Sequence, residues 1–163
     1  MNTTPDIDAA LAAVLERQAI QDLVVRTAIL LDDENLAGWL ALFDEDAQYE
    51  LGAWSPEIRQ AMSWWKADRA MLAKQLDEIA MHVRDPARRR HVLGGAQVDL
   101  AGDTATVVTP FSVYRTLPDG TTTLYLVGRY EDRLRRRCGQ WLYTVHKAQV
   151  DTRVLDSFTH LPL

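Results

Sequence analysis

The chain has 163 residues and a formal net charge of -5, and 47% of its residues are hydrophobic and 25% charged. This size and composition predict one ordinary globular domain, and the acidic balance excludes a global field that attracts nucleic acid. The single cysteine, Cys138, excludes an internal disulfide and fits a reducing compartment. No apolar run approaches the roughly 20 residues that a membrane-spanning helix requires, so we expect a cytoplasmic protein.

The first part of the chain predicts helices. Apolar residues recur broadly at helical spacing over residues 6–32, with no glycine or proline inside. An acidic break at 32–35 separates this helix from a short second helix at 36–43, and residues 47–51 alternate as a strand does.

A third helix is expected from residue 55 to about residue 81. Ser55 and Pro56 would start it, because a capping hydroxyl followed by proline is typical of a helix N-terminus. Asp85 and Pro86 would close the segment, since the residue before a proline is pushed out of helical geometry.

The rest of the chain predicts strands. Four β-rich runs, separated by short turn signals, cover residues 91–100, 104–116, 121–136 and 140–151. Pro110 indicates a bulge or an unpaired position in the second run. Strands joined by tight turns form an antiparallel meander, and helices followed by strands give an α+β fold with helices packed on a curved antiparallel sheet.

Both faces of this sheet are expected to be covered. Successive side chains of a strand point to opposite faces, and large apolar residues occupy both sets of positions: Leu124 and Leu126 alternate with Tyr125 and Val127. Tyr143 continues the pattern in the last strand. We therefore predict that a face carrying Tyr125, Val127 and Tyr143 is buried against another chain.

Two basic runs, at 88–90 and 133–137, lie among acidic neighbours and indicate solvated or interface faces.

A set of short segments along the chain forms a recognisable pattern. The segments are Leu31-Asp32-Asp33, Trp39-Leu40-Ala41-Leu42, Tyr49, Arg90-His91, Gly128-Arg129-Tyr130-Glu131-Asp132-Arg133-Leu134-Arg135-Arg136, Gly139, Trp141 and Val150-Asp151. Together they resemble the small (beta) subunits of aromatic-ring-hydroxylating dioxygenases, over residues 17 to the end.

The resemblance implies a cone-shaped fold of the nuclear-transport-factor-2-like, SnoaL-like superfamily. It implies one domain over 1–163, with a helical arm at 1–16 and the cone at 17–163. It also implies a structural beta subunit in aromatic compound catabolism, whose large (alpha) partner carries a Rieske [2Fe-2S] cluster and a mononuclear iron. Self-association would be trimeric within a hetero-hexamer, and Arg129 would serve packing or assembly. The chain departs from the family at 58–65, where many small subunits have an apolar-Tyr-Asp-Asp stretch.

This chain is not expected to hold a metal or a catalytic residue of its own. A Rieske cluster needs two cysteines and two histidines, and the four histidines show no paired ligand spacing on one element. Cys138 has no adjacent histidine and reads as an exposed turn cysteine.

An alternative function remains open. The superfamily also contains stand-alone SnoaL-like cyclases, ketosteroid isomerases and scytalone dehydratase, so the fold does not decide function. Resemblance to the dehydratase implies a pocket lined by Asp32, His91 and His146, in which a carboxylate orients an imidazole for acid–base chemistry. Leu31 stands where that dehydratase has a tyrosine, and Asp32-Asp33 is also natural as a helix-ending acidic turn.

Overall fold

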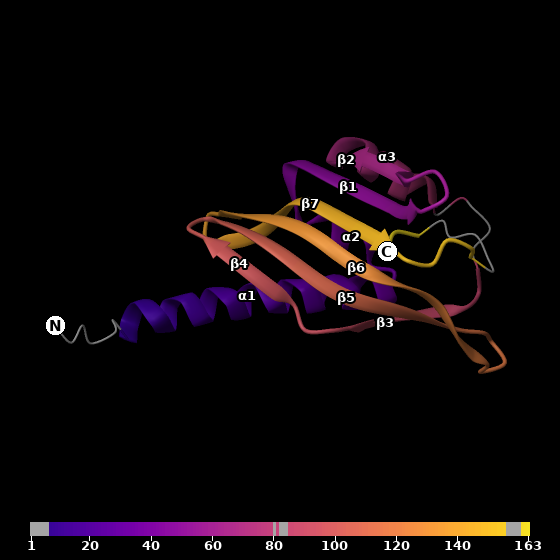
Figure 1. Cartoon of the computed structure of the whole chain (residues 1–163), viewed down its shortest axis with the longest axis horizontal. Helices are drawn as coiled ribbons and strands as arrows, with labels where there is room; N and C mark the ends of the chain where they lie inside the picture. Colours follow the sequence, from indigo (N-terminus) through magenta and orange to yellow (C-terminus); the bar gives the residue numbers. More distant parts are fainter. Residues whose placement is uncertain (1–6, 80, 82–84, 156–160) are drawn as a thin grey trace.

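The computed structural model describes residues 7–79, 81, 85–155 and 161–163 (Figure 1). Its elements follow the order of the chain. They are α1 (Ile7–Asp32), α2 (Leu36–Leu40), β1 (Phe43–Ser55), β2 (Gln60–Asp68), α3 (Arg69–Ile79), β3 (Arg88–Leu93), β4 (Gln97–Ala101), β5 (Thr104–Thr116), β6 (Thr122–Arg137) and β7 (Gln140–Val150). No helix within these ranges is long and apolar enough to cross a membrane.

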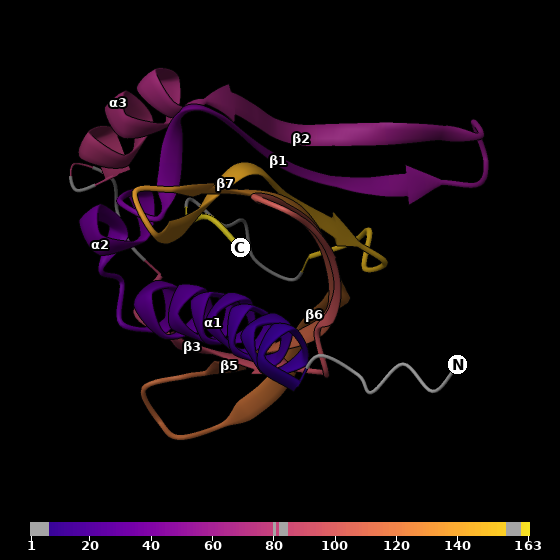
Figure 2. The same cartoon turned by 90° about the vertical axis from the view of Figure 1, so that its left-hand side faces the viewer.

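The strands form one sheet in the order β2-β1-β7-β6-β5-β3, and β4 also pairs with β5. Figure 2 shows this sheet curving around α1, which confirms the predicted α+β cone. The antiparallel meander is confirmed for β5, β6 and β7. The strand β1 lies outside this predicted meander and pairs with β7 in parallel. Pro110 lies where the partner of β5 changes from β4 to β3.

The predicted helix from residue 55 to residue 81 is wrong in its first half. The segment instead turns at residues 56–59, where Arg59 has a φ of 52°, and returns as β2 along β1. The hydroxyl of Ser55 bonds to Glu57 and caps no helix. Trp65 packs edge-on against Tyr49 of the neighbouring strand, so tertiary contact of an aromatic pair overrides the local helix signal. The helix α3 begins only at Arg69, after Asp68 accepts a hydrogen bond from the amide of Met71.

Only the second half of α1 enters the cone. Its buried residues are Ile20, Leu23, Val24, Thr27, Ala28 and Leu31. The N-terminal end of α1 extends beyond the sheet (Figure 1), and the first half of the helix is held to the sheet through Glu16. That carboxylate accepts from the indole of Trp141 at 2.8 Å and pairs with Arg136 at 2.8 Å.

The arginines at the end of β6 lie at the surface and form ion pairs within the chain. Asp44, almost fully buried at the start of β1, accepts from Arg137 at 2.6 Å and lies 3.1 Å from the Arg135 guanidinium. Arg135 also reaches Asp46 at 2.6 Å. These contacts hold the β6–β7 hairpin against β1.

Gly128 marks a close approach between β6 and β7. A Cβ atom there would lie 2.4 Å from the carbonyl oxygen of Gln149 and 2.8 Å from Cα of Val150. Both atoms belong to the backbone of the paired strand, so they cannot rotate away. The glycine that opens the Gly-Arg-Tyr segment is therefore required by the spacing of the two strands.

We predict that Gly128→Ala lowers the free energy of unfolding by about 1–3 kcal/mol through overpacking. Gly95→Ala is the matched control, because nothing lies within 4 Å of a Cβ at that position. Urea unfolding of both variants measures the difference. Equal midpoints for the two variants would contradict the close approach.

Candidate functional site

Asp32 and His91 form a buried pair at one side of the cone. Asp32 ends α1, and His91 lies on β3 with its Nδ1 atom 2.7 Å from Asp32 Oδ1. The backbone amide of His91 also donates to both carboxylate oxygens, at 3.0 and 3.1 Å. The side chains are 3% and 1% exposed, so Asp32 is more than a helix-ending turn residue. The predicted pairing of Asp32 with His91 is present.

His146 belongs to a different pair. Its Nδ1 atom lies 2.7 Å from Asp132 Oδ1, with side chains that are 1% and 0% exposed. Asp132 lies on β6 directly opposite His146 on β7. Burial raises the pKa of Asp132, and the neighbouring His146 opposes this effect. The structure therefore shows two Asp–His pairs where the sequence indicated one carboxylate and two histidines.

Aromatic rings join the two pairs. Phe111 lies 6.3 Å from His91 and stacks on Tyr130 at 4.1 Å, between ring centroids. Tyr130 in turn lies 4.9 Å from His146. Burial raises the pKa of Tyr130 well above its ordinary value, and Tyr49 and Asp132 add to the effect, as does Asp32. Asp32 and Asp132 therefore both raise the pKa of the Tyr130 hydroxyl.

The two Asp–His pairs and the aromatic and polar residues around them, here called the inner cluster, contain several buried polar atoms that have no hydrogen-bond partner among the described residues. They are Trp39 Nε1, His91 Nε2, Thr109 Oγ1, Tyr130 OH, Asp132 Oδ2 and His146 Nε2. An imidazole whose Nδ1 faces a carboxylate keeps Nε2 available to accept or donate a proton. This arrangement supports hydrogen bonding and acid–base chemistry. Within the described ranges, no three His, Cys, Asp or Glu residues gather as metal ligands.

Asp132 and Tyr130 were not predicted as site residues, because the sequence places them only within the family motif at 128–136. Only part of the signal was available: residues 130, 132 and 134 alternate onto one face of β6, and the structure buries all three. Asp132 also faces His146 across two strands joined by a short turn. Simple pairing across the Cys138-Gly139 turn, where both φ angles are positive, places Asp132 opposite Val145, and the register shift beside Thr144 brings Asp132 opposite His146 instead.

The predicted interface residues separate onto different faces. Val127 is half-buried on the outer face of β6, and Arg129 beside it is exposed and pairs with Glu131 at 2.8 Å. Tyr143 lies fully inside the cone, where its hydroxyl bonds to Thr27 at 2.8 Å. Tyr125 is also buried, with the Arg89 guanidinium 5.5 Å above its ring. The prediction that Tyr125 and Tyr143 share an intersubunit face with Val127 is therefore wrong.

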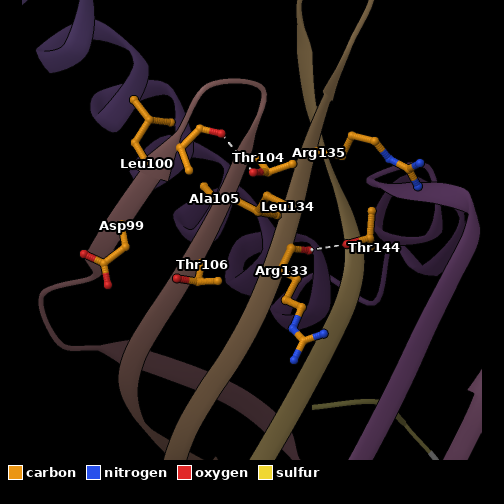
Figure 3. A pocket seen from close by; sticks show the side chains of 10 residues that line it. Asp99, Leu100, Thr104, Ala105, Thr106, Arg133, Leu134, Arg135 and Thr144 are labelled. Carbon is orange, nitrogen blue, oxygen red and sulfur yellow. Dashed lines mark hydrogen bonds between the residues drawn. The ribbon is translucent and has the colours of Figure 1, made fainter.

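A depression on the outer face of the sheet is a weaker candidate (Figure 3). It lies across β4, β5 and β6 and is lined by Asp99, Thr106, Arg133 and Thr144 among others. The hydroxyl of Thr144 already donates to the carbonyl oxygen of Arg133 at 3.2 Å. Its polar groups are paired or exposed, so it offers little catalytic chemistry.

Comparison with known proteins agrees with this fold. A family model described as a SnoaL-like domain matches residues 12–146. The chain is 32% identical to the methanesulfonate monooxygenase hydroxylase subunit beta of Methylosulfonomonas methylovora, over 99% of this chain and 96% of that protein. It is 27% identical to the 2-aminobenzenesulfonate 2,3-dioxygenase subunit beta of an Alcaligenes species, over 91% of this chain and all of that protein.

A solved structure adds to these relatives. The beta subunit ascribed to an aromatic-ring-hydroxylating dioxygenase of Novosphingobium aromaticivorans superposes with a TM-score of 0.78. It is 26% identical, and the match covers 86% of this chain and 92% of that one. The fold is thus the SnoaL-like cone shared with these small subunits. The chain belongs to the SnoaL-like domain family, and the resemblance to dioxygenase beta subunits is confirmed.

We predict that Tyr49, Tyr130 and Tyr143 ionise only when the chain unfolds. Burial raises the pKa of all three above the ordinary value of about 10. Their contribution to stability is complete below that value and is lost as the pH rises past it, because the unfolded state then loses protons first. Tyrosinate absorbance should therefore rise for these residues together with loss of the folded circular dichroism signal. Their ionisation in a still-folded chain would contradict the closed cluster.

Proposed function

We propose that this chain is the non-catalytic beta subunit of a two-subunit, Rieske-type ring-hydroxylating oxygenase. The observation that carries the proposal is similarity over nearly the whole chain to proteins that are themselves beta subunits. A relative that matches from end to end aligns with the strands of the outer face as well as with the core. The chain's role is then to assemble with a large alpha subunit.

Exposed apolar groups support such an assembly. The outer face of β3, β5 and β6 carries Val92, Tyr114 and Leu124, and Tyr114 lies opposite Leu124 in the sheet. The β1–β2 hairpin exposes Trp54 and Trp64. The outer half of α1 exposes a further apolar group, consisting of Ile7, Leu11, Val14 and Leu15. Exposed groups of this size and kind are typical of subunit contacts. We propose that the arm expected at residues 1–16, of which residues 1–6 lie outside the described ranges, acts in these contacts through the exposed start of α1.

We further propose that the Rieske cluster and the mononuclear iron lie in the alpha subunit. The residues of this chain do not fit the cluster, because Cys138 is its only cysteine and is exposed in a turn. The assembly would be a trimer of these pairs in the cytoplasm. The names of the two beta subunits concern methanesulfonate and 2-aminobenzenesulfonate. Choice of substrate would reside in the alpha subunit, where the iron is.

A second candidate function is a stand-alone lyase, isomerase or cyclase. The two buried Asp–His pairs, Asp32 with His91 and Asp132 with His146, favour it. A carboxylate that orients an imidazole is the usual arrangement of a general base. Activity of the chain without any partner would distinguish this candidate from the beta subunit.

We expect Leu124→Glu to weaken assembly with the alpha subunit at least about tenfold, because an unpaired carboxylate is costly to bury in an interface. Met71→Glu on α3 is the matched control, since Met71 is 51% exposed and Leu124 is 53% exposed. The measurement is the amount of each variant that co-purifies with a tagged alpha subunit. Iron should be found in the purified alpha subunit and not in this chain when it is purified alone. Equal recovery of both variants would remove the outer sheet face from the interface.

Asp32→Asn and His91→Gln should leave turnover per assembled complex within a few-fold of the unsubstituted protein. The reason is that a beta subunit contributes structure, whereas loss of a general base costs roughly 100- to 10,000-fold in rate. Turnover is normalised to complex isolated by size exclusion. Complexes that assemble fully but lose nearly all turnover would refute the non-catalytic role.

A further inference from the structure

Residues 161–163 enter the interior of the cone after the last strand has ended. Beyond β7 the chain first leaves the core, because Arg153 and Val154 are exposed. Pro162 is buried again, and Leu163 is fully buried within the hydrophobic core. Figure 2 shows the C-terminal residues inside the curve of the sheet, between β7 and α1 in that view.

A hydroxyl inside the cone holds Leu163. Tyr49 OH accepts from the backbone amide of Leu163 at 3.0 Å and donates to its carbonyl oxygen at 3.4 Å. Tyr49 lies opposite His146 in the pairing of β1 with β7, and the two ring centroids are 6.0 Å apart. Leu163 therefore covers the residue that lies beside the Asp132–His146 pair.

The segment 161–163 can leave without unfolding the sheet. It belongs to none of the described helices and strands, and segments outside those ladders open locally at lower free energy than the strands. Pro162 fixes its own φ angle and favours extended geometry at Leu161, so little conformational entropy is lost when the segment inserts again.

The interior of the cone also favours opening. Four of its buried polar atoms have no partner within the described ranges, namely Thr109 Oγ1, Tyr130 OH, Asp132 Oδ2 and His146 Nε2. A polar atom buried in this way costs free energy that a hydrogen bond to water returns. Water admitted by the departure of Leu163 would therefore offset part of the apolar burial that is lost.

We propose that residues 161–163 are a displaceable plug, held by the Tyr49 hydroxyl, which closes the cone and shields the Asp132–His146 pair from solvent. In the closed state, which the structure shows, the His146 side chain is 1% exposed. In the open state Tyr49 and then His146 Nε2 meet water, so acid–base chemistry at this pair requires the plug to leave first. The inference goes beyond the proposed beta-subunit role and does not rest on it, because the plug and its contacts belong to this chain alone.

Carbethoxylation by diethyl pyrocarbonate tests this inference, because the reagent modifies a neutral imidazole nitrogen that solvent reaches. The full chain is compared with a chain that lacks residues 161–163, and mass spectrometry of peptides gives the rate at His146. We expect the shortened chain to react there at least about tenfold faster, since burial of Leu163 and its hydrogen bonds no longer hold the cone closed. Equal rates in the two folded proteins would overturn the proposal.

Tyr49→Phe removes the anchoring hydroxyl and keeps the ring. It should raise the rate at His146 several-fold, roughly the effect of one or two lost hydrogen bonds. Tyr114→Phe is the matched control, because that tyrosine is 39% exposed on the outer face, and it should react as the unsubstituted chain does. Equal rates in these two variants would also overturn the proposal.

Leu42→Ala separates opening of the plug from unfolding of the whole chain. Leu42 is buried and lines a depression with Gly139 and Gln140, beside the β6–β7 turn, whereas the plug follows the other end of β7. The cavity left by this substitution should destabilise the whole fold. At urea concentrations that give equal free energies of unfolding, we expect faster reaction of His146 in the shortened chain. Equal rates there would assign the exposure to global unfolding and refute the plug.

Tyrosine ionisation gives a second measure that does not use the reagent. Burial raises the pKa of Tyr49, and without the plug this pKa should fall toward its ordinary value of about 10. The folded shortened chain should then form one more tyrosinate than the folded full chain at the same pH, and equal numbers would contradict an opened cone. If the shortened chain does not fold, the rate at His146 in Tyr49→Phe decides. Because these measurements use the chain alone, their failure leaves co-purification with the alpha subunit unaffected as a test of the beta-subunit role.

Discussion

The parallel pairing of β1 with β7 is the constraint on which the rest of the structure depends. It joins the first strand to the last, and so extends the curved sheet beyond β7 by the β1–β2 hairpin. The register also sets Tyr49 beside His146, which completes the inner row of side chains. The start of β1 then carries Asp44 to the arginines at the end of β6. A long-range strand pair therefore determines both the shape of the cone and the content of its interior.

The sequence predicted the elements whose signals are local. The long helix, the short second helix and the strands that follow the turns at 101–103, 118–120 and 138–139 lie close to their expected positions. The run expected as one strand at 91–100 is instead divided into β3 and β4, which pair with different parts of β5. The segment at 55–81 failed because Ser55 and Pro56 carry the local signature of a helix start. Pairing with β1 and the packing of Trp65 on Tyr49 decide the structure there, and neither is visible from local pattern.

The candidate site was predicted in part for the same reason. Asp32 and His91 could be matched because the family motif contains both positions. The faces of β6 and β7 could not be assigned by alternation, since each strand contains an irregularity. The register with β5 shifts beside Tyr125, so Leu124 faces outward while Leu126 is buried. The register of β6 with β7 shifts beside Thr144, so Tyr143 and His146 both face inward. One extra residue reverses every side chain beyond it.

These irregularities also separate two kinds of chemistry on one sheet. The shift beside Tyr125 delivers Leu124 to the outer face, where Tyr114 and Val92 provide apolar surface for a partner. The shift beside Thr144 delivers His146 to the inner face opposite Asp132. Substitutions on the outer face can then tune assembly without reaching the inner cluster, because contacts more than several ångströms apart behave additively. A family built on this cone can in this way keep an interior of paired carboxylates and imidazoles while its outer surface specialises in binding another subunit.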